Sequence, residues 1–247
     1  MALSGRQHHP IPRHSQSTDK ADGGHSSNGS GTDNANGTGG VGGTDGADGD
    51  NQDTVTDNPL KIVESGWSAD QQGYVHYAFA LRNTSKTQQV QYPQITITGR
   101  AKDGSIVFSQ TQALNMAFPN QTVYDAGQAG EGTAPETVDF TVLNPDTYNV
   151  AKAQGTAAFP ISGTSKIDNR DGGTTFNGEV RAVADGFKPS DGQQIKISLV
   201  LRNAQNAIIY GDIAFVDWPG NGRSTPFSIT VYDLPKYVSY DLYAQIW

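Results

Sequence analysis

Apolar residues recur at every second position in several short segments of the chain. Segments with this alternation begin at Val75, Ile95, Val138, Ile195 and Phe227. The pattern is typical of antiparallel strands that pack one face against a core and expose the other face to water. No stretch shows a convincing helical period. The sequence therefore predicts an all-β fold.

Turn-forming pairs such as Asp103-Gly104 and Asp191-Gly192 separate these segments. Short strands at regular spacing are typical of a sandwich or a barrel. One pattern also occurs twice: residues 100–108 align with 202–210, Phe118-Pro119 aligns with Trp218-Pro219, and 140–148 aligns with 227–237. A unit of about 80–105 residues has the size of an Ig-like sandwich. We therefore expect two tandem antiparallel Ig-like β-sandwich domains, residues 59–164 and 165–247.

The first 58 residues have a different composition. From Ser15 to Asn58 there is no Leu, Ile, Met, Phe, Tyr or Trp, and eight Asp stand against one Lys. A segment with low hydrophobicity and high net charge cannot bury enough apolar surface to offset its chain entropy. We expect residues 1–58 to be a disordered Gly/Asp/Asn-rich leader that acts as a flexible, acidic tether.

The formal net charge of −8 at pH 7 argues against nucleic acid as a partner, because that binding needs clustered Lys and Arg. The chain has no Cys, which excludes disulfides, Cys-ligated zinc and thiol catalysis. No apolar run is long enough to span a bilayer, so we expect no direct membrane insertion by this chain. Met1–Ser15 lacks the apolar region of a signal peptide. We expect an anchor or signal upstream of this chain, and an extracytoplasmic location in the cell envelope or as a secreted protein.

The second unit carries residues that resemble a known group of modules. The segments 206–217, 219–220, 226–227 and 235–247 are similar to the FxLYD-like Ig-like sandwich modules of Gram-positive bacterial cell-envelope and exported proteins. The similarity covers most of residues 176–247 and, more loosely, 60–160. It implies a tandem sandwich fold, export or lipid anchoring, and no catalytic role.

Residues that could carry catalysis are scattered. His76 is the one His after the leader, and no nucleophile motif accompanies it. Four aspartates of the second unit fall at turns and on the solvent faces of predicted strands, where they are interpreted as surface charge: Asp212, Asp217, Asp233 and Asp241. In the leader, the Asp-rich run 45–53 lacks the closing Glu of an EF-hand. We expect no enzyme activity, no catalytic residue, no metal site and no cofactor.

Aromatic side chains of the second unit are the candidate binding residues. They are Trp218, Tyr232, Tyr237 and Tyr243. Packing in the core or between the domains is the alternative, since Tyr and Trp serve both purposes. Tyr240 lies on the opposite strand face from Tyr243, and we expect it in the core.

Together these features predict a non-catalytic extracytoplasmic or cell-surface module, binding or structural, that presents two β-sandwiches on a flexible acidic tether. We expect a protein partner, held at sheet edges and loops. The alternative is a carbohydrate-binding module that binds glycan through the exposed Tyr and Trp of the second domain. An enzyme has the least support, because no paired acid and base or nucleophile constellation is present.

Overall fold

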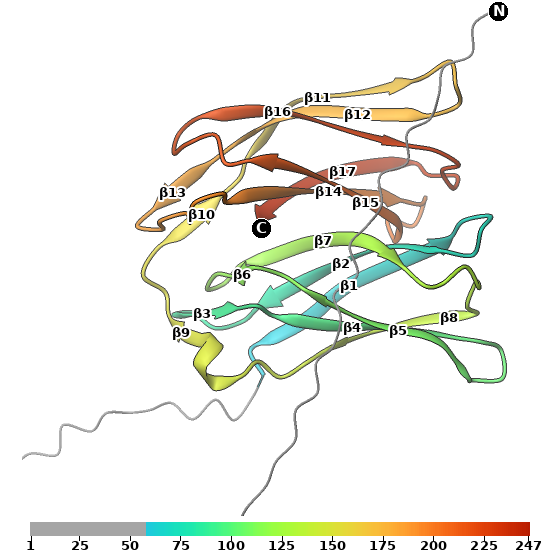
Figure 1. Ribbon diagram of the computed structural model, residues 1–247, viewed down its shortest axis with the longest axis horizontal. Coiled ribbons are helices and arrows are strands. Elements are labelled where there is room, and N and C mark those ends of the chain that lie inside the picture. The colour runs from blue at the N-terminus through green and yellow to red at the C-terminus, as the bar shows by residue number, and fades with distance from the viewer. Residues whose placement is uncertain (1–57) are drawn as a thin grey trace, which may run out of the picture. The chain divides into compact units, whose positions relative to one another are not determined.

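The alternating segments form antiparallel strands. The computed structural model describes residues 58–247 (Figure 1), and the strand pairs within them are antiparallel. One short 3₁₀ turn, η1 (Thr147–Asn149), is the helical element of this part of the chain, and no helix there is long and apolar enough to cross a membrane. The predicted all-β fold is confirmed. The leader predicted for residues 1–58 lies outside the described residues, apart from Asn58.

Two three-stranded sheets make up the first sandwich. Its strands are β1 (Leu60–Ala69), β2 (Val75–Asn83) and β7 (Thr122–Ala129) in one sheet, and β5 (Ile106–Ala113), β4 (Gln94–Arg100) and β8 (Thr137–Val142) in the other. The core between them includes the buried side chains of Tyr77, Phe79, Leu81, Ile95 and Ile97. A small third sheet contains β6 (Met116–Ala117), β3 (Gln88–Gln91) and β9 (Val150–Lys152).

The second sandwich also consists of two three-stranded sheets. Its strands are β11 (Ile161–Asp168), β12 (Thr174–Arg181) and β16 (Ser224–Val231) in one sheet, and β15 (Ile208–Asp217), β14 (Gln194–Arg202) and β17 (Ser239–Ile246) in the other. Its core includes Phe176, Ile195, Ile197, Leu199 and Leu201. Strands β10 (Thr156–Ala158) and β13 (Val183–Asp185) form a separate pair. The domain boundary predicted at residues 164–165 falls inside β11, which pairs with β12 of the second sandwich.

The two sandwiches repeat one arrangement of strands. The hairpin β4–β5 corresponds to β14–β15, and in both the register shifts just before an arginine, Arg100 or Arg202. The sheet orders β1-β2-β7 and β11-β12-β16 correspond, as do β5-β4-β8 and β15-β14-β17. The predicted alignment of 140–148 with 227–237 is wrong, because Phe140 lies in β8 and Phe227 in β16, whereas the counterpart of β8 is β17. Both strands alternate apolar and polar residues, so the pattern did not distinguish them.

The sandwiches stack through one sheet each (Figure 1). We call β1-β2-β7 and β15-β14-β17 the inner sheets, and β5-β4-β8 and β11-β12-β16 the outer sheets. Between the inner sheets lies a small buried cluster of Ala78, Ala126, Val200 and Ile208, which we call the junction together with the side chains around it. The described residues all belong to one compact unit.

The expectation of one solvated face per strand is wrong for the central strands of the two inner sheets. Ala78 and Ala80 lie on the face of β2 opposite the core, and both are buried. Lys196 and Ser198 occupy the corresponding face of β14 and are buried too. The neighbouring sandwich takes the place of water on these faces. Lys196 has its charged partner, Asp125, across the junction.

Candidate functional site

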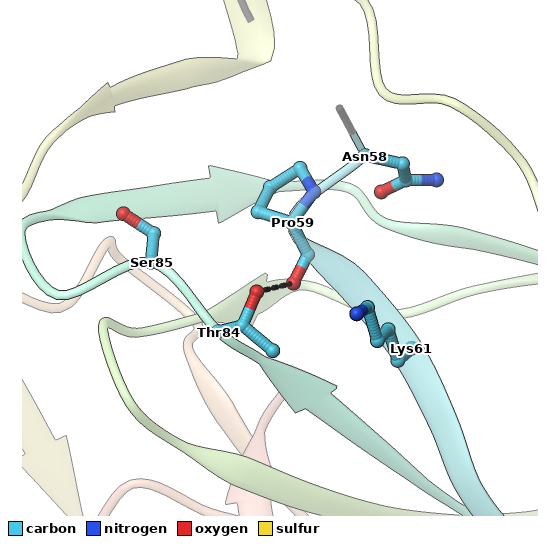
Figure 2. Close-up of a pocket in the computed structure, with 5 residues that line it drawn as sticks. All are labelled: Asn58, Pro59, Lys61, Thr84 and Ser85. Atoms are coloured by element: carbon cyan, nitrogen blue, oxygen red, sulfur yellow. Dashed lines mark hydrogen bonds between the residues drawn. The ribbon is translucent and has the colours of Figure 1, made fainter. Parts of the chain in front are cut away.

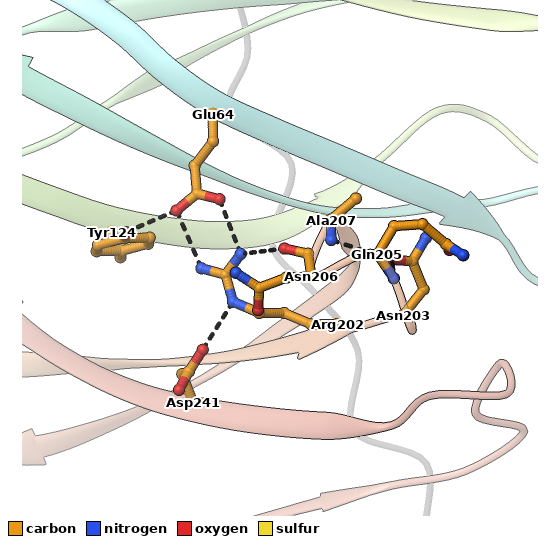
Figure 3. Close-up of polar contacts among 8 residues, drawn as sticks. All are labelled: Glu64, Tyr124, Arg202, Asn203, Gln205, Asn206, Ala207 and Asp241. Carbon is orange, nitrogen blue, oxygen red and sulfur yellow. Dashed lines mark hydrogen bonds and ion pairs between the residues drawn. The ribbon is translucent and has the colours of Figure 1, made fainter.

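Arg202, the last residue of β14, joins the two sandwiches (Figure 3). Its Nη1 and Nη2 donate to the two carboxylate oxygens of Glu64 in β1, at 2.8 and 2.9 Å. Its Nε donates to Asp241 in β17 at 2.7 Å, and the hydroxyl of Tyr124 in β7 donates to Glu64 at 2.6 Å. The hydrogen bond from Arg202 holds the pKa of Glu64 below its ordinary value. A bidentate pair of this kind fixes orientation as well as distance.

A second ion pair crosses the junction, and both of its charged groups are buried. The Nζ of Lys196 lies 2.6 Å from Oδ1 of Asp125, with side-chain exposures of 2% and 0%. The amide of Gln245 donates to the same oxygen at 2.7 Å, and the ring of Trp247 lies 4.7 Å from Nζ. Burial raises the pKa of Asp125, against the opposing effect of Lys196. Ser198 Oγ, Asp125 Oδ2 and Gln245 Oε1 are buried without a hydrogen-bond partner among the described residues.

Small residues let the inner sheets approach closely. A Cβ added to Gly66 would collide with the carbonyl oxygen of Ile208, and one added to Gly211 would collide with the backbone of β2. The rings of Tyr124 and Tyr243 stack across the junction with centroids 3.7 Å apart. Shape, stacking and two ion pairs together hold the sandwiches in one defined arrangement.

Three of the four predicted binding residues pack against other side chains of the molecule. Trp218 meets Phe159 edge-on with ring centroids 5.7 Å apart, and the ring of Tyr237 lies 6.4 Å from that of Phe176. Both are partly buried against the core of the second sandwich. Tyr243 is the junction residue described above. Packing, the alternative considered for these aromatic residues, is what their surroundings provide.

Tyr232 is the fourth predicted binding residue, and it is 54% exposed. Its hydroxyl donates to Asp171 at 3.2 Å. Among the aromatic pairs of residues 58–247, none joins two of the four predicted side chains. The structure therefore does not bring them together into one platform. Tyr240, expected in the core, packs on Phe176 at 4.8 Å between ring centroids.

His76 lies beside a depression of about 80 Å³ between the two sandwiches. Its Nε2 is 3.4 Å from Oδ2 of Asp70, and its ring stacks on Tyr210 with centroids 4.7 Å apart. The depression also contacts Asp233. Within residues 58–247 no group of three or more His, Cys, Asp and Glu side chains is arranged to hold a metal ion.

An exposed tyrosine in the first sandwich has an unfavourable backbone conformation. Tyr92 follows β3 with a φ of 50°, in the left-handed region that bulky residues avoid. It also precedes Pro93, and a residue before proline is normally extended. Its N–H donates to the carbonyl of Asn115, and the N–H of Leu114 donates to the carbonyl of Pro93, both at 2.9 Å. These bonds hold a strained loop that leaves Tyr92 57% exposed, and strain of this type is concentrated at functional sites.

Tyr92 borders a depression of about 100 Å³ that we call the tyrosine depression. The other residues that line it are Gln94, Leu143, Asn144, Pro145, Asp146 and Asn149. A second tyrosine, Tyr148 of η1, is 80% exposed and donates its hydroxyl to Asp146 at 2.7 Å. Each amide of the lining offers both donors and an acceptor. One exposed tyrosine and several amides thus line one small concave surface, and a second exposed tyrosine, Tyr148, is hydrogen-bonded to its Asp146.

A larger hollow of about 500 Å³ lies beside the start of β1 (Figure 2). Its lining residues are Asn58, Pro59, Lys61, Thr84 and Ser85. The hydroxyl of Thr84 donates to the carbonyl of Pro59 at 2.8 Å, which ties the two walls together. The amide of Asn58 donates to the carbonyl of Leu143 at 3.1 Å, and Leu143 lines the tyrosine depression. Both hollows therefore lie at one end of the first sandwich.

The tyrosine depression was not predicted from the sequence, because its residues come from two loops that are far apart along the chain. Two local signals mark those loops. A tyrosine stands directly before a proline at Tyr92-Pro93, and a turn begins at Asn144-Pro145. Neither signal shows that the two loops meet, since their contact depends on the pairing of β3 with β9.

The fold and its surfaces define an all-β protein of two stacked antiparallel sandwiches. No model of a known protein family matches the chain, and no curated protein sequence matches it. Among solved structures, the exo-chitosanase CsxA of Amycolatopsis orientalis is similar over 71% of this chain and 24% of that chain, with 10% sequence identity and a TM-score of 0.20. The chain thus spans about a quarter of the length of that enzyme. A likeness this distant assigns no activity to the chain.

Proposed function

We propose that this chain is a non-catalytic binding module of the cell envelope whose two sandwiches act as one rigid head on an acidic tether. The junction carries this proposal. Two ion pairs, Glu64 with Arg202 and Asp125 with Lys196, cross it and stabilise one arrangement of the sandwiches. A preorganised surface loses less conformational freedom when it binds a partner. The resemblance to FxLYD-like envelope modules supports the extracytoplasmic location.

The partner is a protein held at loops and sheet edges, and an interaction screen tests this. The full chain and a fragment of residues 58–247 are immobilised and exposed to cell-envelope proteins, and captured proteins are then measured one at a time by calorimetry. We expect both baits to bind the same partner with similar affinity. The matched variant Arg202→Ala, which loosens the junction, should bind more weakly. Partners that bind only the bait with the leader would refute the proposal.

Carbohydrate binding is the second candidate, and the tyrosine depression favours it over the four aromatic residues of the second domain. An exposed ring can stack on the apolar face of a sugar, and the amides of Asn144 and Asn149 can pair with its hydroxyls. Asp146 is the charged group of the lining, so a neutral sugar fits better than an anionic one. A depression of about 100 Å³ contacts one ring of a longer glycan at most.

A glycan array with the full chain tests this candidate. Tyr92→Gly and Tyr148→Ala should each abolish the signal for neutral oligosaccharides. Tyr232→Ala is the matched control, because Tyr232 is also exposed and also donates its hydroxyl to an aspartate, Asp171. No glycan signal from the parent chain, or equal loss in the control, would exclude the tyrosine depression as a sugar site.

A further inference from the structure

The hydrogen bonds around Arg202, which we call the Arg202 fork, are partly repeated around Arg100 on the outer sheet of the first sandwich, and we call this second set the Arg100 fork. Arg100 ends β4 as Arg202 ends β14. In Arg100, Nε donates to Asp139 at 3.1 Å and Nη1 to the carbonyl of Gly104 at 3.3 Å. In Arg202, Nε donates to Asp241 at 2.7 Å and Nη1 to the carbonyl of Asn206 at 2.9 Å. The aspartates also correspond in register, since Asp139 pairs with Thr98 and Asp241 with Val200, each two residues before its arginine.

The two forks differ in their third partner. Arg202 grips the carboxylate of Glu64 from the neighbouring sandwich with both terminal nitrogens. Arg100 has no such carboxylate among the described residues, and its side chain is 41% exposed. A guanidinium already held by an aspartate and a carbonyl is preorganised for a bidentate carboxylate. Arg100 is therefore suited to bind a second carboxylate, in addition to that of Asp139, through its terminal nitrogens.

By analogy with Glu64, we expect the carboxylate that binds Arg100 to lie on the sheet that corresponds to β1-β2-β7. Glu64 belongs to β1-β2-β7, whose counterpart is the outer sheet β11-β12-β16 of the second sandwich. On that outer sheet Ser162 takes the position of Glu64, and the acid lies on the neighbouring strand: Glu179, which pairs with Ser162, takes the position of Ala80, which pairs with Glu64. Glu179 is exposed and borders an open hollow of about 430 Å³, and it has no ion pair among the described residues.

We propose that two copies of this chain associate head to tail, with the Arg100 fork of one copy binding Glu179 of the other. At the junction, sheet β1-β2-β7 meets sheet β15-β14-β17. The outer sheets β11-β12-β16 and β5-β4-β8 are the counterparts of these two, in the same order. A contact between unlike surfaces of this kind can continue from copy to copy. The outer sheets would then face each other as the inner sheets do, at a greater separation.

Side chains of the outer sheets make this contact weaker than the junction. Ser109 stands where the inner sheet has Gly211, because Thr98 pairs with Ser109 and Val200 pairs with Gly211. The added side chain prevents the closest approach of the two sheets. With few apolar groups to bury, the association depends on charge and is reversible, and it should weaken as salt rises.

Sedimentation velocity of the full chain over a concentration series tests the proposal. At low ionic strength the sedimentation coefficient should rise with concentration, and the rise should shrink in high salt. Arg100→Glu and Glu179→Arg should each weaken self-association by roughly tenfold or more, because each brings like charges together. An equimolar mixture of these two variants should associate again, since each then meets the opposite charge.

The control is Lys102→Glu, which reverses an exposed charge two residues from the fork and should leave association unchanged. A chain that stays monomeric at every concentration would overturn the proposal. Loss of association in Arg100→Glu but not in Glu179→Arg would also overturn it, because Arg100 would then bind a different acid. Failure of the mixture to associate would do the same.

Discussion

Lys196 of the second sandwich and Asp125 of the first form an ion pair 2.6 Å long that is almost completely shielded from water. Charges are expensive to bury, and the attraction between them offsets that cost only while both are present. Replacing Lys196 by Met leaves the carboxylate of Asp125 without its cation. We expect Lys196→Met to lower the free energy of unfolding by about 3–5 kcal/mol, measured by chemical denaturation.

Two further variants separate this effect from a general loss of packing. Asp125→Leu combined with Lys196→Met removes both charges and should recover most of the lost stability. Lys166→Met breaks the exposed pair of Lys166 with Asp168 and should cost less than about 1 kcal/mol. If Lys196→Met were as mild as Lys166→Met, the ion pair would not stabilise the junction.

Acid should weaken the junction through Glu64. The pKa of Glu64 is lowered in the folded chain by its hydrogen bond from Arg202, from an ordinary value of 4.5. The unfolded chain therefore takes up the proton first as the pH falls. The stabilisation is complete above pH 4.5 and is lost as the pH drops through the lowered folded value. We expect the melting temperature of the parent chain to fall more steeply below pH 4.5 than that of Glu64→Gln.

Comparing the parent chain with Glu64→Gln also separates the pH dependence caused by Glu64 from that caused by Asp125. Burial raises the pKa of Asp125, so its contribution to the pH dependence has the opposite sign. Asp125 is present in both proteins, and its contribution cancels in the difference. Parallel pH profiles for the parent chain and Glu64→Gln would show that the Arg202 fork does not stabilise the fold.

Alternation along the chain predicted several of the strands. The row from Val75 to Leu81 forms β2, and the row from Ile195 to Leu201 forms β14. Alternation separates two faces of a strand but does not show what covers the second face. Lys196 and Arg202 have the polar character of solvated positions, yet both are buried by the other sandwich. Their burial depends on how two complete sandwiches pack, which no local pattern encodes.

Local sequence patterns also failed to identify the exposed residues of the candidate sites. Aromatic content directed attention to Trp218 and Tyr243, whose rings are used in packing. Tyr92 and Tyr148 lie at the surface, the first with a left-handed backbone and the second in a short 3₁₀ turn. Backbone conformation at a single residue depends on hydrogen bonds from distant segments. Strand alternation placed Tyr240 against the core, but it gave no guide for tyrosines in loops such as Tyr92.

Glycines in the inner sheets should control the distance between the sandwiches. Gly66→Ala adds a methyl group against the backbone of Ile208 across the junction. We expect faster hydrogen exchange at β1 and β15, with the two cores still protected. Gly99→Ala is the contrasting variant, because its methyl group meets Phe108 inside the first sandwich. Gly99→Ala should speed hydrogen exchange in the first core and leave the second core protected. Identical exchange patterns for Gly66→Ala and Gly99→Ala would show that Gly66 does not control the distance between the sandwiches.

The strain at Tyr92 predicts an inverted order of stability between two substitutions. Gly adopts a φ of 50° without a steric penalty, whereas the Cβ of Ala is crowded by the backbone at this φ. Both remove the ring, so loss of its packing cancels between them. We expect Tyr92→Gly to be about 1 kcal/mol more stable than Tyr92→Ala in chemical denaturation.

At Tyr148, which has no left-handed φ, the usual order should hold and Ala should be the more stable substitution. The ordering at Tyr148 controls for the greater freedom that glycine gives the unfolded chain. If Ala were the more stable substitution at both positions, the loop before Pro93 would not be held in its strained form in solution. The reason to assign Tyr92 a function beyond packing would then be lost.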